Sequence, residues 1–372
     1  MKKIALIAAM SLAALVSCTK NETAPSVTEQ QEITFASPVV GVSTKVPTYG
    51  LLSGAYPTTQ TFNVWAWYSE KDTYDGEGEV KKYMTDVTVA YYDKNFNDLE
   101  DENGAWAPTP TYYWPKNGKL TFDAYSPTEL KTKATVACTA SAGLTIKNYT
   151  VPTTLEEQID VLYSNRAADK VSTSFTTGTT YEGVDIVFNH ALAAVAFTIK
   201  QSEAYPAGTI KVQDIIINAL SNGNFAHNIT YTAGTVAVAP AWDDQNTPAE
   251  YKALACADYE NSVQPVNAEG AAGATVLVLP QEFTVDNDVT ITVNYYIKNQ
   301  NEDALLQKAV FHLKDVANQS GKYQSDQSPV TVDEWEMGKK YTYNLTIGLD
   351  DIFFAPTITE WVGVNVSLPE IK

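Results

Sequence analysis

The amino-acid sequence predicts an all-β protein built from β-sandwich domains, and three observations support this prediction. Tyrosine, phenylalanine and tryptophan occur 22, 12 and 7 times, and aromatic residues favour strands. Short segments with bulky residues at every second position recur along the chain. No helical period is sustained over three turns, apart from a weak candidate over 154–161. Because helices and strands do not alternate, a parallel α/β sheet is not expected.

The chain begins with the pattern of a bacterial lipoprotein signal. Two lysines precede an apolar stretch over 4–16, and the small residue Ser17 stands before Cys18. The lysines stay on the cytoplasmic side, the apolar stretch enters the translocon, and a peptidase cuts before the cysteine. This stretch is shorter than the roughly 20 residues that a spanning helix needs. We predict a signal peptide over 1–17 and an envelope or surface lipoprotein with acyl chains such as palmitate on Cys18. An ordinary secretory signal or a short membrane anchor is the alternative.

Strands are expected wherever apolar and polar residues alternate. The stretch 62–68 has bulky residues on both faces, including Trp65 and Trp67, as in a strand covered on both sides. Half-covered strands, apolar on one face, are expected over three later stretches: 193–199, 289–297 and 341–349. The stretch 233–266 contains three prolines and is expected to form long surface loops.

Chain length and composition predict two domains. The polar stretch 18–31 is expected to be a flexible tether that follows the lipidated cysteine. About 354 residues follow the signal, which is enough for two domains. The stretch 168–183 is rich in serine, threonine and glycine and is the expected seam. We therefore predict an N-terminal β-sandwich domain over 32–180 and a C-terminal one over 181–372.

Charge and reactive residues argue against several functions. The net charge of -19 disfavours nucleic acid as a partner, because phosphate binding requires clustered lysine and arginine. Cys138 and Cys256 are far apart and predict neither a disulfide nor a zinc site. His190, His227 and His312 have no spacing typical of a nucleophile and its base. His190 is instead expected to bridge backbone groups at the domain seam. We predict no enzyme activity, catalytic residue, metal site or cofactor.

Several motifs follow in order behind the lipoprotein signal, at 112–115, 120–127, 160–164, 187–192, 338–347 and 356–361. Together they resemble the fimbrillin-like proteins of Bacteroidales, which are subunits of surface pili. The resemblance covers nearly the whole chain. It implies two tandem transthyretin-like antiparallel β-sandwich domains. It also implies that a trypsin-like protease removes the lipidated N-terminus with the first strand. A strand from a neighbouring subunit then fills the opened groove, which is β-augmentation in physical terms.

The cleavage that this resemblance implies can be placed on the chain. The first strand would be 33–37, and Lys45 is the nearest basic residue and the candidate cleavage site. The family often has arginine at this cut, whereas the only arginine here is Arg166. Two alternatives remain open: a protease that is not arginine-specific, or a subunit that is never cut and acts as an anchor. Lys45 would then be an ordinary loop lysine.

The C-terminal stretch 361–368 is the candidate donor strand. Four apolar residues, here called plugs, share one face of this strand: Val362, Val364, Val366 and Leu368. Burying each of these side chains could contribute roughly 1.5 to 3 kcal/mol. The alternative is that this strand completes the protein's own C-terminal domain.

The sequence therefore predicts a structural subunit of a surface fimbria that is polymerised by protease-triggered strand exchange and supports cell adhesion. The expected partners are other copies of this chain, related pilus subunits and the maturation protease. Before cleavage, lipid on Cys18 would hold the subunit to the outer membrane, and afterwards it would be part of the extracellular fimbrium. The alternative is a surface lipoprotein that binds glycans through exposed aromatics. The candidates for that role are Trp65, Trp67, Trp106 and Trp242.

Overall fold

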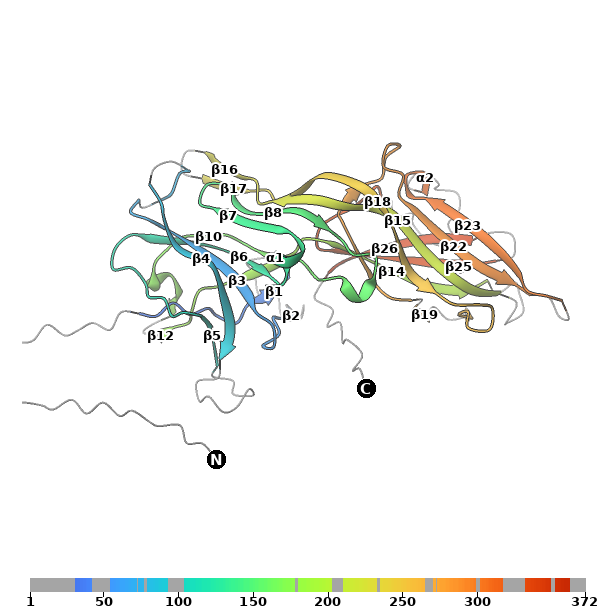
Figure 1. Ribbon diagram of the computed structural model, residues 1–372, viewed down its shortest axis with the longest axis horizontal. Coiled ribbons are helices and arrows are strands. Elements are labelled where there is room, and N and C mark those ends of the chain that lie inside the picture. The colour runs from blue at the N-terminus through green and yellow to red at the C-terminus, as the bar shows by residue number, and fades with distance from the viewer. Residues whose placement is uncertain are drawn as a thin grey trace, which may run out of the picture.

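The computed structural model describes residues 31–41, 54–71, 73–76, 79–92, 104–177, 180–202, 210–232, 235–264, 270–271, 273–298, 302–316, 332–348 and 352–361. Most of the regular structure in these residues is β-strand, and they form two lobes arranged along one long axis (Figure 1). The predicted all-β class is confirmed. Neither described helix is long or apolar enough to cross a membrane.

The N-lobe is a nine-stranded sheet with the order β2-β1-β13-β9-β6-β3-β4-β5, and β10 pairs with β6. Its strands are β1 (Val39–Val40), β2 (Gly54–Ala55), β3 (Phe62–Ser69), β4 (Lys81–Tyr92), β5 (Ala105–Pro108), β6 (Lys119–Ser126), β9 (Leu162–Ser164), β10 (Ala167–Lys170) and β13 (Val187–His190). The pair β1–β13 is parallel, whereas the other pairs in this sheet are antiparallel.

The C-lobe consists of two sheets that enclose one core (Figure 1). The first sheet has the order β19-β14-β25-β26, with β20 on β14. Its strands are β14 (Ala193–Gln201), β19 (Gly270–Ala271), β20 (Val276–Val278), β25 (Lys339–Ile347) and β26 (Ile352–Glu360). The second has the order β23-β22-β15-β8-β7, with β18 on β15. Its strands are β7 (Thr135–Thr139), β8 (Gly143–Thr150), β15 (Ile210–Ala226), β18 (Ala241–Ala255), β22 (Thr290–Ile297) and β23 (Leu305–His312). Strands β14 and β25 run parallel, so antiparallel pairing dominates without being universal.

Short elements complete the fold. Three two-stranded pairs are β11 (Thr176–Thr177) with β12 (Thr180–Tyr181), β16 (Ile229–Thr232) with β17 (Thr235–Val238), and β21 (Gln281–Glu282) with β24 (Glu334–Trp335). The helices are α1 (Leu130–Lys133), α2 (Leu313–Val316) and the 3₁₀ turns η1 (Leu155–Glu157) and η2 (Ser172–Phe175). The weak helical candidate over 154–161 is thus a single 3₁₀ turn.

Most of the strand predictions are confirmed, and one loop prediction is wrong. The four alternating stretches correspond to β3, β14, β22 and β25. The stretch 233–266, expected to be loop, contains β17 and the long strand β18. Strand β18 lies at the side of β15 with largely exposed side chains, so burial imposes no alternation on it. Pro248 is tolerated there because a strand at the rim of a sheet needs no N–H on its outer side.

The two lobes interleave along the chain. The β7–β8 hairpin pairs with β15 in the C-lobe, although it precedes strands β9 and β10 of the N-lobe. The C-lobe core also includes Trp65, Tyr125 and Tyr163, which project from N-lobe strands. A separate N-lobe core surrounds Phe62 and Phe122. The domain division between residues 180 and 181 stays a prediction.

Candidate functional site

Residues 31–41, here called the closing segment, lie between two edges of the N-lobe sheet. On one side the segment bonds to the chain around β5: Ile33 N–H to the Tyr112 carbonyl (2.8 Å), Phe35 N–H to the Trp106 carbonyl (2.8 Å) and Trp114 N–H to the Gln31 carbonyl (2.9 Å). On the other side it bonds to the chain leading into β13: Val184 N–H to the Thr34 carbonyl (2.8 Å), Ala36 N–H to the Val184 carbonyl (3.0 Å) and Gly41 N–H to the Phe188 carbonyl (3.0 Å). The segment therefore joins two sheet edges that would otherwise present unpaired backbone groups.

Side chains of the closing segment fill the N-lobe core. Ile33, Phe35 and Val40 are only 1%, 2% and 7% exposed. The Phe35 ring meets Phe62 and Phe122 edge to face, at centroid distances of 5.5 and 6.1 Å. Burying three such side chains contributes roughly 4 to 9 kcal/mol as an upper estimate. Removing the segment would thus expose an apolar groove as well as two strand edges.

The closing segment differs in detail from the strand predicted over 33–37. Within that range the structure has isolated bridges at Phe35, to Trp106 and to Val184, rather than a continuous ladder. The ladder resumes as β1. Pro38 separates the two parts, because it has no N–H to donate to a neighbouring strand.

Lys45, the candidate cleavage site, lies outside the described residues, and so does Cys18. The chain on either side of Lys45 is described: Val39 pairs with Ala55 and Val40 with Gly54, so β1 and β2 are antiparallel neighbours. A cut at Lys45 would leave the closing segment held only by hydrogen bonds and apolar contacts. The same cut would separate Cys18 from the folded chain.

At the other end of the chain, Trp361 is the last described residue. It follows β26, and its side chain is buried, with 6% exposed. The candidate donor plugs lie beyond it, outside the described residues: Val362, Val364, Val366 and Leu368. The alternatives for stretch 361–368, a donor or a strand of its own domain, both stay predictions.

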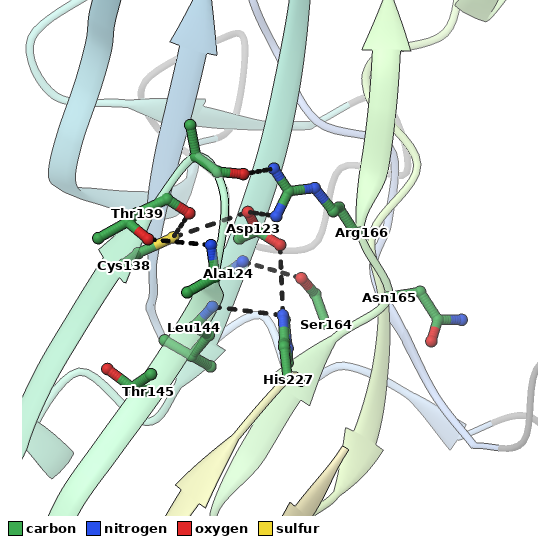
Figure 2. A network of polar contacts seen from close by, with 12 residues as sticks. Asp123, Ala124, Cys138, Thr139, Leu144, Thr145, Ser164, Asn165, Arg166 and His227 are labelled. Atoms are coloured by element: carbon green, nitrogen blue, oxygen red, sulfur yellow. Dashed lines mark hydrogen bonds and ion pairs between the residues drawn. The ribbon is translucent and has the colours of Figure 1, made fainter. Parts of the chain in front are cut away.

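Arg166, the only arginine, lies in a buried polar network (Figure 2). Its Nη1 lies 3.3 Å from Asp123 Oδ2 on β6, and its Nη2 donates to the Ala140 carbonyl in the turn of the β7–β8 hairpin. The exposed fractions of the two charged side chains are 3% and 0%. Arg166 is therefore no substrate for a protease while the chain is folded.

Two further side chains reach the same carboxylate. Cys138 Sγ on β7 lies 3.6 Å from Asp123 Oδ2, and His227 Nδ1 lies 3.4 Å from Asp123 Oδ1. The Leu144 N–H donates to the same His227 nitrogen at 3.3 Å. Burial, and then the charge of Asp123, raise the pKa of the Cys138 thiol well above its usual value. The thiol is therefore a weak donor here and no nucleophile.

Sequence reasoning did not identify this network. Its members come from β6, the end of β9, the β7–β8 hairpin and the end of β15, and only the fold brings them together (Figure 2). The available signal was Asp123, a charged residue in the middle of an otherwise largely apolar strand.

The three histidines lie apart and each contacts a carboxylate. The pairs are His190 with Asp160 (2.9 Å), His227 with Asp123 (3.4 Å) and His312 with Asp288 (2.8 Å). The expectation that the His190 side chain bridges backbone groups is wrong, because its Nδ1 faces a carboxylate and its ring stacks on Trp361. Among the described residues, no three His, Cys, Asp or Glu side chains gather to hold a metal ion. Both described cysteines are free.

The tryptophans proposed for glycan binding do not form an exposed platform. Trp65, Trp67 and Trp106 are 5%, 7% and 2% exposed, and Trp242 is half-buried. The Trp242 indole N–H donates to the Ala191 carbonyl at 2.5 Å. Three of these rings are core residues and Trp242 packs against the core, so the glycan-binding alternative loses the side chains on which it depended.

Comparisons with known proteins agree with this fold. A family model described as fimbrillin-like matches residues 54–361. No curated protein matches the chain. The structure of a fimbrial protein from Bacteroides vulgatus is similar, with a TM-score of 0.56 and 17% identity, over 88% of this chain and 99% of that one. Two candidate cell adhesion proteins are more distant. The one from Bacteroides ovatus has a TM-score of 0.47 and 13% identity, over 90% and 99% of the two chains. The one from Bacteroides uniformis has a TM-score of 0.44 and 16% identity, over 89% and 99%.

Proposed function

The chain belongs to the fimbrillin-like family, and from this premise we propose that it is a structural, non-enzymatic subunit of a surface fimbria that supports cell adhesion. We further propose that it is exported as a lipoprotein through Cys18 and polymerises by strand exchange. The closing segment is the observation that best supports this proposal. It is bonded on both sides, its side chains fill the N-lobe core, and it is joined to the rest of the fold through the stretch that contains Lys45.

In this proposal the uncut subunit is the closed form. The closing segment occupies the backbone groups of Trp106 and Val184, so these positions are not open to a second strand. As long as the chain is intact, the segment has a high effective concentration at its own groove and excludes competitors. A protease of the trypsin type that cuts at Lys45 ends this advantage, because the segment then dissociates like any separate peptide.

The strand that replaces the closing segment is 361–368 of a neighbouring subunit. Its four plugs alternate along the strand as Ile33 and Phe35 do, so they can enter the vacated pockets. Backbone groups of the incoming strand would pair with those of Trp106 and Val184, which the closing segment satisfies in the closed form. Repetition of this step produces a polymer of identical joints.

The proposal is tested with recombinant protein that starts after Cys18. Limited treatment with a lysine-specific protease should remove the N-terminal residues, leave the β-sheet circular dichroism intact and convert monomers to oligomers in size-exclusion chromatography with light scattering. Lys45→Ala should keep its closing segment under the same treatment, even if the chain is cut at Lys20, and should remain monomeric. A second chain that carries the recognition site of a highly specific viral protease within 42–53 separates the effect of removing the segment from the choice of protease.

Two outcomes would change the proposal. If the second chain is cut, loses its closing segment and still remains monomeric, polymerisation by strand exchange is wrong. If surface material from the producing cell retains a lipidated Cys18, the subunit is an anchor rather than a repeating unit of the stalk. Sequencing the N-terminus of that material distinguishes the two, because a stalk subunit should begin near Val46.

A further inference from the structure

Trp361 directly precedes the four plugs of the candidate donor strand and is here called its root. Backbone contacts hold Trp361 at the junction of the lobes. The Trp361 N–H donates to the Gly338 carbonyl at 2.8 Å, and the Gly338 N–H donates to the Leu192 carbonyl at 3.0 Å. Gly338 has a φ of 70°, a backbone conformation that is strained for most residues other than glycine. Leu192 lies in the connection between β13 and β14, where the chain passes from the N-lobe to the C-lobe.

The Trp361 side chain is held by a ring stack. Its ring lies parallel to that of His190, with centroids 3.8 Å apart and an angle of 8° between the planes. His190 is 3% exposed, and its Nδ1 lies 2.9 Å from Asp160 Oδ1. The carboxylate thus orients the imidazole, and the imidazole in turn orients the indole. The Trp361 ring therefore has a restricted orientation before a neighbouring subunit binds.

The strand that carries His190 also borders the closing segment. Val187 and Phe188 pair with Val39 and Val40 of β1, and His190 follows two residues later on the same strand, β13. One four-residue strand therefore forms an edge of the groove and holds the root of the donor. The position of the root relative to the groove within one subunit is fixed by this strand.

We propose that His190 is a positioning residue for strand donation. By stacking on Trp361 it fixes the residue from which the candidate donor stretch continues, so that 362–368 can enter a neighbour's groove without first ordering the residue that precedes it. This inference rests on the proposed strand exchange and adds the residue that presents the strand. Asp160 acts behind His190 by fixing the orientation of its ring.

Losing the stack should slow the insertion of a subunit's own strand into a neighbour's groove, here called donation. It should not change the binding of a neighbour's strand in the subunit's own groove, here called acceptance. A strand with a mobile root samples more directions, and fixing it again on binding costs affinity and rate. We expect His190→Ala to slow donation on the order of tenfold, which corresponds to about one rotamer-rich side chain left unfixed. His190→Phe keeps a planar ring over the indole and should restore most of the rate.

The test separates the two activities by using full-length chains that can perform only one of them. An uncut chain can only donate, because its closing segment occupies its own groove. A cut chain with Val364→Asp can only accept, because a charged plug cannot enter an apolar pocket. Mixing the two should give a defined dimer, whose rate of formation is followed by fluorescence from a dye on each chain.

Donors that carry His190→Ala, His190→Phe and His312→Ala are compared with the unaltered donor. His312→Ala is the matched control, because His312 also faces a carboxylate through Nδ1 but is 44% exposed and lies on β23, which is not in the same sheet as β26.

The outcomes distinguish this inference from the proposed function. If the unaltered donor forms no dimer with the cut acceptor, strand exchange itself is wrong. If the unaltered donor forms the dimer and His190→Ala does so equally fast, His190 has no positioning role. Cut chains that carry both His190→Ala and Val364→Asp should accept an unaltered donor at the normal rate. Equal loss of acceptance and donation would assign His190 to the fold and overturn the proposal.

Discussion

Arg166 and Asp123 form an ion pair that is closed off from solvent, with Nη1 3.3 Å from Oδ2 and exposed fractions of 3% and 0%. Asp123 belongs to the N-lobe sheet, whereas the other groups around the pair come from the β7–β8 hairpin and the end of β15 in the C-lobe sheet. Both members of the pair lie in the N-lobe, and their contacts with these C-lobe groups join the two lobes. In a fimbrial subunit, such a joint would resist bending between the lobes when the fibre is pulled.

Replacing Arg166 with methionine should lower the free energy of unfolding by about 3 to 5 kcal/mol, because Asp123 would be left as a buried charge without a cation. The double variant Arg166→Met with Asp123→Leu should recover most of that loss, since an apolar pair needs no compensation. Urea denaturation followed by circular dichroism measures both values.

The control for this variant is an exposed ion pair. Lys81 lies 4.0 Å from Glu70, with side chains 67% and 77% exposed, so Lys81→Met should change the free energy of unfolding by less than about 1 kcal/mol. Equal effects at Arg166 and Lys81 would contradict the buried-pair account.

An arginine-specific endoprotease should leave the folded chain intact, because the single target side chain is buried. In urea the same enzyme should cut once, giving an N-terminal fragment that ends at Arg166 and the fragment 167–372, which mass spectrometry identifies. Lys45→Arg should make the folded protein sensitive to this enzyme if 42–53 is where the maturation protease acts. Cleavage of the folded, unaltered chain after Arg166 would show that the buried network opens readily.

Three of the four strands that could be predicted from the sequence have one buried face and one face towards solvent, whereas β3 was predicted as, and is, a strand covered on both sides. Strands β14, β22 and β25 alternate because the C-lobe core lies on one side of each. β18 could not be predicted in this way, because its exposed side chains carry no period. Periodicity reports the face of a strand that is buried, but not the strand that lies beside it.

The candidate site was predictable only in part for the same reason. A buried strand near Phe35 follows from its apolar alternation, but its two neighbours, at Trp106 and Val184, are far away in the sequence. The stack of His190 on Trp361 leaves no local pattern either. Both contacts depend on which strand edges the fold brings together.

Phe35→Ala should lower the free energy of unfolding of the uncut chain by about 3 to 5 kcal/mol, as expected for removing a buried aromatic ring. After the closing segment has been cut and removed, the same substitution can have no effect, because the residue is gone. Ser37→Ala, at an exposed position of the segment, is the control and should stay within about 0.5 kcal/mol. Thermal and urea unfolding before and after proteolysis measure the difference. A loss that persists in the cut protein would mean that the segment had not left the groove.

The buried tyrosines predict a loss of stability at alkaline pH. Burial raises the pKa of Tyr163 and that of Tyr341 to about 12, from an ordinary value near 10. Because the folded-state pKa is the higher one, their contribution is complete below about pH 10 and is lost as the pH rises towards 12. Each tyrosine then removes about 1.4 kcal/mol per pH unit from the free energy of unfolding. Burial also raises the pKa of Tyr149, Tyr251 and Tyr343, which act in the same direction.

Tyr163→Phe isolates one of these contributions. Between about pH 10 and 12 the slope of unfolding free energy against pH should be shallower than in the unaltered chain by about 1.4 kcal/mol per pH unit. Below pH 9 the two chains should differ only by a constant offset. Urea denaturation at each pH gives the free energies, and absorbance at 295 nm shows whether phenolate appears together with unfolding. Phenolate from Tyr163 that forms near pH 10 while the sheet remains folded would mean that water reaches this ring, and the packing of Tyr163 against Phe225, with centroids 4.9 Å apart, would then have to open in the native state.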